Sequence, residues 1–396
     1  MRVTSRVLIA LAILASLLSF IKFQHCAAID WQQPGTNIHA CYSDIPALFY
    51  ERDLNRDKWP FSGQVDRTVE YPVLQAMAMW ATAKVTPDNV HFYYYFSIAL
   101  LIALFIATVL VVHKIAPTKS YLYAIAPTGV AAAFINWDMW AIITMLLAIY
   151  WFDKKRYDYS AIALAISCAT KFFPIILLIP IFIYFLRSSQ IRAFIKYAAI
   201  SIGGYLFINL PFALTTPAGW WRFFDLNIHR NPDWGSLWLA LEFSDVSIPH
   251  FNVVTILVVI IALSVAMLFT LNTVDNLPLA STAIFFIAIV MTLGKVYSPQ
   301  YVLWLAPLVV IACIEKKVAP FFWAWQGVEI MYHFAIWLHL AGLSGDKALI
   351  PQSFYTTAIY LRIAGLALLI WALASQHRKS SNFPREFLFE SGGIYP

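Results

Sequence analysis

Long apolar runs with few charges recur along this chain of 396 residues, and they restrict it to folds that are built inside a membrane. Val7 to Phe23, Phe96 to Val112, Phe251 to Leu271 and Leu277 to Leu293 each approach the roughly 20 apolar residues that a helix needs to cross the hydrocarbon core. Charged residues make up only 12% of the chain, against about 25% in soluble domains. The sequence therefore predicts an all-α polytopic membrane protein.

The apolar pattern predicts about twelve membrane spans. They cover residues 7–23, 91–112, 120–136, 139–152, 159–170, 172–186, 197–213, 251–271, 277–294, 301–314, 318–340 and 355–374. The first run is expected to stay in the protein, because no small-residue cleavage pattern follows Phe23. Together the spans form one domain, residues 1–375, and residues 376–396 form a tail.

Lys and Arg collect in the short loops of one side, which is typical of the cytoplasmic side. This rule places both chain ends in the cytoplasm, although the inner turn Asn272 to Asn276 carries Asp275 and no basic residue. Two long polar segments, 24–89 and 214–250, then lie on the outer face, where we expect the chemistry. The net charge of +6 reflects this topology and gives no reason to expect nucleic acid binding.

The first outer segment carries an acidic group, Asp44 in Tyr42-Ser43-Asp44, just before a stretch that predicts a short interfacial helix. A carboxylate at the bilayer surface can serve as a general base for water-soluble sugar groups. Asp44 can equally be only the cap of that helix, since Asp and Ser are both common caps. The sequence leaves these two alternatives open.

Further charged and polar groups fall at the predicted outer ends of spans, where an ionisable residue needs a partner or a role. Lys171 and Lys295 oppose the positive-inside bias, so they are candidates for binding a phosphate, although each can instead pair with Glu70 or Asp138. In the second outer segment, Trp220 and Trp221 indicate an interfacial belt, while His229 and Arg230 remain candidates for the site. His333 is a candidate phosphate ligand or a buried histidine bonded to a neighbouring helix.

The four cysteines are few, and only Cys26 and Cys41 share a segment on the oxidising side. A disulfide between them and a pair of free thiols both remain open. Cys168 and Cys313 are expected to be ordinary lipid-facing or helix-facing residues.

Five short motifs follow one another in order along the chain. They are the aspartate of the first outer segment, Glu-Tyr-Pro, Asn-Trp-Asp, Lys-Phe-Phe-Pro and Ser-Pro-Gln-Tyr-Val-Leu-Trp-Leu-Ala-Pro. This order resembles the GT-C superfamily of membrane glycosyltransferases, and most closely glycosyltransferase family 87, the polyprenyl-phosphate-mannose-dependent mannosyltransferases of actinobacteria. The resemblance covers about residues 5–375.

The resemblance implies a GT-C bundle in the bacterial plasma membrane, acting as a monomer on the periplasmic face. The donor would be polyprenyl-phosphate-mannose and the acceptor a lipid-linked glycan such as a phosphatidylinositol mannoside, with inversion at the sugar and with no metal or cofactor. Asp44 matches the catalytic aspartate of the family. The expected donor-phosphate ligands are Lys171, Lys295, Arg230 and His333, and the expected cavity residues are Tyr42, Glu70, Tyr71, Asn136, Asp138, His229, Trp234, Gln300 and Tyr301.

Two other functions fit parts of this pattern. A flippase or exporter of lipid-linked sugars would share the cations and aromatic residues of the cavity but would not need Asp44 as a base. A structural membrane scaffold would need neither. Replacing Asp44 by Asn separates these hypotheses, since base catalysis contributes about a hundredfold or more.

Overall fold

The computed structural model describes residues 3–56, 58–86, 88–272, 278–312, 316–345 and 348–378. Within these ranges the regular structure is helical, with no strand. Asp275, Cys313 and the part of the expected tail beyond Arg378 lie outside the described residues.

The α-helices are α1 (Ser5–Ala28), α2 (Gly35–Ile38), α3 (Asp44–Glu51), α4 (Val73–Val85), α5 (Val90–Ile115), α6 (Ser120–Ala124), α7 (Pro127–Ala132), α8 (Met139–Asp153), α9 (Tyr157–Thr170), α10 (Leu178–Arg187), α11 (Ile191–Thr215), α12 (Pro217–His229), α13 (Leu237–Glu242), α14 (Phe251–Leu271), α15 (Leu279–Leu293), α16 (Val302–Ala312), α17 (Ala319–Ser344) and α18 (Gln352–Arg378). Short 3₁₀ helices occur at η1 (Leu54–Arg56), η2 (Val65–Arg67), η3 (Phe173–Leu177), η4 (Pro299–Tyr301) and η5 (Lys316–Val318).

Five of the described helices, α1, α5, α11, α14 and α18, are long and apolar enough to cross a membrane. Four shorter apolar segments add to them: α8, η3 with α10, α15, and η4 with α16. Each predicted span except one coincides with a helix or with a 3₁₀ turn that a helix continues. The expected count of twelve spanning helices is therefore not confirmed, because several of these helices are shorter than the bilayer core requires.

The predicted span 120–136 is wrong as a single helix, because the chain breaks there into α6 and α7. Pro127 starts the second piece, and Ala126 before it has extended backbone angles. Proline has no N–H to donate and keeps the preceding residue out of the helical region, so the two pieces cannot join.

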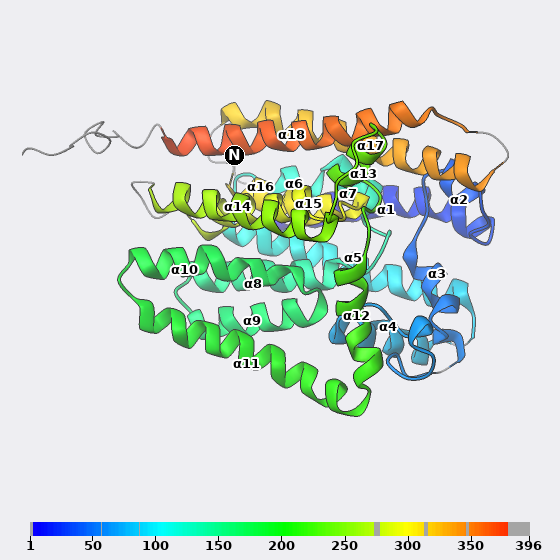
Figure 1. The fold of residues 1–396 in the computed structure, drawn as a ribbon, viewed down its shortest axis with the longest axis horizontal. Coiled ribbons are helices and arrows are strands. Elements are labelled where there is room, and N and C mark those ends of the chain that lie inside the picture. Colours follow the sequence, from blue (N-terminus) through cyan, green and yellow to red (C-terminus); the bar gives the residue numbers. More distant parts are fainter. Residues whose placement is uncertain are drawn as a thin grey trace, which may run out of the picture.

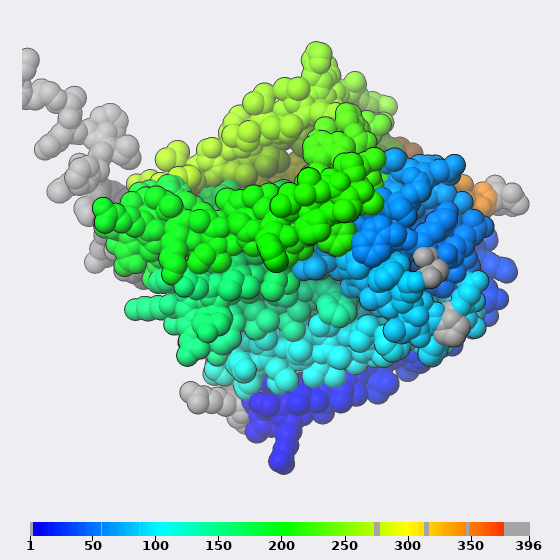
Figure 2. Space-filling view, turned by 90° about the horizontal axis from the view of Figure 1, so that it is seen from below, coloured from blue at the N-terminus to red at the C-terminus, as the bar shows by residue number. Residues whose placement is uncertain are grey.

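The long helices run side by side in Figure 1, and α12 crosses them at one end of the bundle. The chain of the first outer segment lies at the same end, around α3 and α4. Figure 2 shows α11 and α12 against this segment on one face of the molecule. The contact includes a hydrogen bond from the Arg222 guanidinium to the Val65 carbonyl. The two polar segments that the sequence placed on one side of the membrane thus meet at one end of the bundle.

The first outer segment is tied to α1 by a disulfide between Cys26 and Cys41. This bond decides the alternative that the sequence left open. It holds the start of the segment, including α2, next to the end of the first long helix. Cys168 is a buried free thiol, so of the two expected positions it has the helix-facing one.

Candidate functional site

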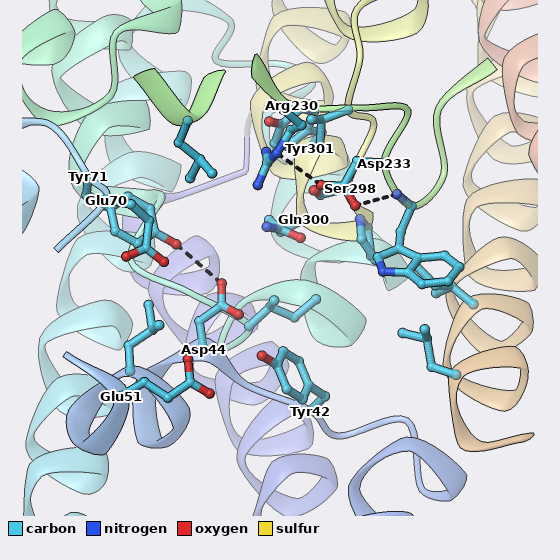
Figure 3. A pocket seen from close by; sticks show the side chains of 18 of the residues that line it. Tyr42, Asp44, Glu51, Glu70, Tyr71, Arg230, Asp233, Ser298, Gln300 and Tyr301 are labelled. Atoms are coloured by element: carbon cyan, nitrogen blue, oxygen red, sulfur yellow. Dashed lines mark hydrogen bonds and ion pairs between the residues drawn. The ribbon is translucent and has the colours of Figure 1, made fainter. Parts of the chain in front are cut away.

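A cavity of about 650 Å³ opens at this end of the bundle, between the first outer segment, α12, the chain around η4, and α17 (Figure 3). Charged, amide and apolar side chains all line it. The lining residues are Gln33, Asn37, Tyr42, Asp44, Leu48, Glu51, Arg52, Glu70, Tyr71, Ile135, Lys171, Phe223, Leu226, Asn227, Arg230, Asp233, Trp234, Val296, Ser298, Pro299, Gln300, Tyr301, Ile336, Trp337, Leu340, Leu343 and Ser344.

Ser43, and not Asp44, is the cap of α3. The Ser43 hydroxyl accepts a hydrogen bond from the Ile45 N–H at 3.2 Å and donates one to the Phe134 carbonyl at 2.7 Å. The Asp44 N–H in turn donates to the Ile135 carbonyl at 2.7 Å. The cap role is therefore taken by the neighbouring serine, which leaves the Asp44 carboxylate to face the cavity.

Tyrosines and charges surround the Asp44 carboxylate. The Tyr71 hydroxyl donates a hydrogen bond to Asp44 Oδ2 at 3.3 Å. Burial raises the pKa of Asp44 to about 6, the positive charge of Lys171 and the hydroxyl of Tyr42 oppose this rise, and the charges of Asp138 and Glu70 add to it. A carboxylate with this pKa can accept a proton near neutral pH, as a general base must.

Lys171 lies between Asp44 and a buried carboxylate. Its Nζ is 2.7 Å from Asp138 Oδ1 and 5.0 Å from the centre of the Tyr71 ring. Asp138 Oδ2 accepts a hydrogen bond from Trp304 Nε1 at 2.9 Å, so both of its oxygens have partners. Burial lowers the pKa of Lys171, but the negative charges of Asp138, Tyr301 and Asp44, together with the hydrogen bond to Asp138, outweigh burial, and the pKa is raised. The lysine therefore remains protonated beside the cavity.

Arg230 lies across the cavity from Asp44 in Figure 3. Its Nε is 3.3 Å from Asp233 Oδ2, and the Asp233 N–H donates to the Lys295 carbonyl at 2.9 Å. This last bond joins the chain after α12 to the chain before η4. Arg230, Asp233 and Trp234 therefore share one wall with Gln300 and Tyr301.

Glu70 is held by a residue that the sequence analysis missed. The Arg52 guanidinium donates two hydrogen bonds to the Glu70 carboxylate, one of them from Nη2 to Oε1 at 2.8 Å. Arg52 and Glu51 both line the cavity. Glu51 lies seven residues after Asp44, which is two helical turns, so the predicted interfacial helix was a signal for it.

Five expected site residues do not line the cavity. Lys295 lies outside it, where its Nζ donates to the Ile228 carbonyl at 2.7 Å and so completes the last turn of α12. His229 is exposed, with Nδ1 3.0 Å from Asp225 Oδ1. Asn136 is buried behind the wall, where its side chain accepts a hydrogen bond from the Asp138 N–H.

His333 is also outside the lining, because it lies one turn deeper in α17 than Trp337, which does line the cavity. It is buried, with its ring centre 6.0 Å from that of Trp337. The expectation that it binds the donor phosphate has no geometric support. Asp138 does not line the cavity itself and meets it through Lys171.

Among the described residues, no three His, Cys, Asp or Glu side chains are grouped so that they could hold a metal ion. Metal-independence of the site stays a prediction.

No protein-family model matches this chain. No curated protein sequence matches it either. Among solved structures, it is similar to ArnT from Cupriavidus metallidurans bound to undecaprenyl phosphate, at 13% identity and a TM-score of 0.47, over 96% of this chain and 79% of that one. This likeness is too distant to define the family of the chain.

Proposed function

We propose that this protein is a membrane glycosyltransferase that moves a sugar from a polyprenyl-phosphate donor to a lipid-linked acceptor. Asp44 is the general base. Mannose as the sugar, a phosphatidylinositol mannoside as the acceptor, and the periplasmic face as the side follow from the resemblance of the five sequence motifs to family 87.

One observation carries this proposal. The partly buried carboxylate of Asp44 has a pKa raised to about 6, and it faces Arg230 across a cavity of about 650 Å³ (Figure 3). In an inverting transfer, the base and the leaving group lie on opposite sides of the anomeric carbon. A base on one wall and a cation on the other match this requirement, since the cation can stabilise the departing phosphate oxygen.

The transfer step is a substitution at the anomeric carbon. The acceptor hydroxyl oxygen forms a bond to that carbon while its proton moves to the Asp44 carboxylate. The bond from the carbon to the phosphate oxygen breaks, and its electron pair stays on the phosphate. We assign the binding of this phosphate to Arg230. Its Nε pairs with Asp233 Oδ2 at 3.3 Å, and a planar guanidinium has further N–H donors that suit phosphate oxygens.

Lys171 has a different part in this mechanism. It lies on the Asp44 side of the cavity and is already paired with Asp138 at 2.7 Å. Its positive charge opposes the rise of the Asp44 pKa. We propose that Lys171 keeps Asp44 ionised and does not bind the phosphate of the donor.

The lining supplies surfaces for both substrates. Apolar side chains of α17, including Leu340 and Leu343, form one side of the cavity, and they can contact the lipid part of a substrate. Tyr42 and Trp337 have ring centres 5.1 Å apart next to Asp44, and such rings can carry a sugar face.

The test is sugar transfer by the purified protein in proteoliposomes, with radiolabelled polyprenyl-phosphate-mannose, a phosphatidylinositol mannoside acceptor, and EDTA. We expect a labelled glycolipid whose new linkage has the opposite anomeric configuration to the donor. If the protein instead moves the donor between leaflets and forms no product, it is a flippase and the proposal is wrong. A fluorescent lipid-scrambling assay on the same vesicles reads this outcome directly.

A further inference from the structure

A buried ion pair lies behind the cavity wall that contains Arg230. Neither partner of the pair lines the cavity itself. Arg362 of α18 and Glu329 of α17 are joined by a 2.8 Å contact between Nη2 and Oε2. Their side chains are 0% and 1% exposed. Charges are expensive inside a membrane protein, so a fully buried pair of this kind indicates a function beyond packing.

The guanidinium of Arg362 is held on several sides. Its Cζ lies 3.6 Å from the ring centre of Tyr297 and 3.7 Å from that of Tyr332, so that the two rings sandwich it. The Glu329 carboxylate also accepts hydrogen bonds from the Tyr297 hydroxyl at 3.0 Å and from Trp325 Nε1 at 3.2 Å. The cluster is rigid because each charged group has fixed aromatic and hydrogen-bonding partners.

This cluster is hydrogen-bonded to the backbone just before η4. Arg362 Nη1 donates to the Tyr297 carbonyl at 2.6 Å, and Nη2 lies 3.5 Å from the Ser298 carbonyl. Ser298 and the next three residues line the cavity. One guanidinium thus joins the ion pair to the chain that forms this part of the wall.

The same cluster supports the chain after α12. The Gly235 N–H donates to the Tyr355 hydroxyl at 2.9 Å, and the Tyr332 and Tyr355 rings are stacked with centres 6.1 Å apart. Gly235 has a φ of +77°, and a Cβ there would overlap the Tyr332 hydroxyl and the Tyr297 carbonyl. Only glycine lets this chain approach the cluster so closely. Gly235 directly follows Trp234 of the wall.

We propose that the Arg362–Glu329 pair positions the cavity wall formed by residues 230–235 and 296–301, and that this position sets the affinity for the donor. The part about the donor rests on the proposed function. Arg362 and Glu329 are positioning residues, because they act through the backbone of the wall and touch neither substrate. A 1 Å displacement of a binding group by a distant residue can cost about a hundredfold in rate.

Two variants separate positioning from stability. Arg362→Lys keeps the charge facing Glu329, but an ammonium group lacks the planar fork that reaches the carboxylate and the Tyr297 carbonyl together. The double variant Glu329→Met with Arg362→Met leaves no stranded charge. Replacing a buried pair by apolar side chains is often neutral for stability, so this variant is expected to fold.

The position of the wall can be measured in the absence of any sugar substrate. The measured quantity is the rate at which a water-soluble maleimide labels the cysteine of Ser298→Cys. The background carries Cys168→Ala and Cys313→Ala, and Cys26 and Cys41 are protected by their disulfide. We expect both variants to change this rate by about tenfold or more, as local opening of the wall does. The exposed control Ser62→Cys, in the first outer segment, keeps its rate.

Donor KM is expected to rise about tenfold in both variants, while the acceptor KM stays unchanged. Unchanged labelling at position 298 would overturn the proposal, and so would loss of folding in both variants, since either result assigns the pair to something other than positioning. Altered labelling in a protein that transfers no sugar would overturn the proposed function and leave the positioning of the wall intact.

Discussion

The Tyr71 hydroxyl donates a hydrogen bond to Asp44 Oδ2 at 3.3 Å, although the two residues are separated by 26 residues of the first outer segment. Tyr71 also lies under Lys171, with 5.0 Å between Nζ and the ring centre. Two motifs that are far apart in the sequence, Glu-Tyr-Pro and Lys-Phe-Phe-Pro, thus contribute side chains near the carboxylate of Asp44. The charge of that carboxylate therefore depends on both Tyr71 and Lys171.

Transfer should lose activity in mild acid. Burial raises the pKa of Asp44 from 3.8 to about 6, and a base must be ionised to take a proton. The ionised fraction is therefore full above this pKa and falls as the pH drops through it. A profile of kcat against pH, taken with saturating donor and acceptor, should show an acidic limb with its midpoint near 6. A limb near 4, or none, would argue against Asp44 as the base.

Removing the charge of Lys171 should move this limb upward. The lysine opposes the rise of the Asp44 pKa and Asp138 adds to it, so Lys171→Met alone leaves Asp44 harder to ionise. The expected change is about one pH unit toward neutral. In the matched double variant, Lys171→Met with Asp138→Asn, the two effects oppose each other and the limb should return toward its original position. Identical profiles in the single and double variants would contradict the assignment of Lys171.

Arg230 should control donor binding. Arg230→Gln removes the guanidinium that faces the departing phosphate, so donor KM is expected to rise about tenfold and kcat to fall. Lys295→Gln is the control, because this lysine donates to the Ile228 carbonyl at the end of α12 and does not line the cavity. A larger effect from Lys295 than from Arg230 would show that the phosphate binds elsewhere.

Ser43 should matter for stability and Asp44 should not. Ser43→Ala removes the α3 cap and the 2.7 Å hydrogen bond to the Phe134 carbonyl, which is expected to lower the free energy of unfolding by about 1–2 kcal/mol. Asp44→Asn removes neither. Thermal unfolding in detergent reads the difference, with the exposed Ser62→Ala as control. An equal loss of stability in Ser43→Ala and Asp44→Asn would indicate that Asp44 has a structural role.

Hydropathy predicted most of the helices, because long apolar runs indicate segments that lie inside the bilayer or the bundle. It failed at 120–136, where Pro127 and the extended Ala126 break the chain. The pattern carries no information on how α6 and α7 pack after the break. The count of twelve spans is not confirmed for a similar reason. Hydropathy does not show where a helix begins and ends within an apolar run, so a short helix such as α16 was counted as a full span.

The candidate site was predicted in part. Asp44, Glu70, Tyr71, Lys171 and Arg230 do meet in one cavity, because their motifs fall at helix ends on the same side of the bundle. The sequence predicts the position of a residue along the bundle axis, but not the direction in which its side chain points around that axis. Lys295 and His333 were therefore placed in the cavity wrongly, and Arg52 was missed because its partner Glu70 is 18 residues away.

The role of Asp44 as the base of a sugar transfer can be measured by comparing Asp44→Asn with Glu51→Gln in the proteoliposome assay at pH 7.5. Glu51 is a matched control, since it lines the same cavity from the same helix. We expect Asp44→Asn, still folded, to lose about a hundredfold or more in initial rate, while Glu51→Gln stays within about threefold of the unaltered protein. Transfer by Asp44→Asn at close to the unaltered rate would contradict this role of Asp44.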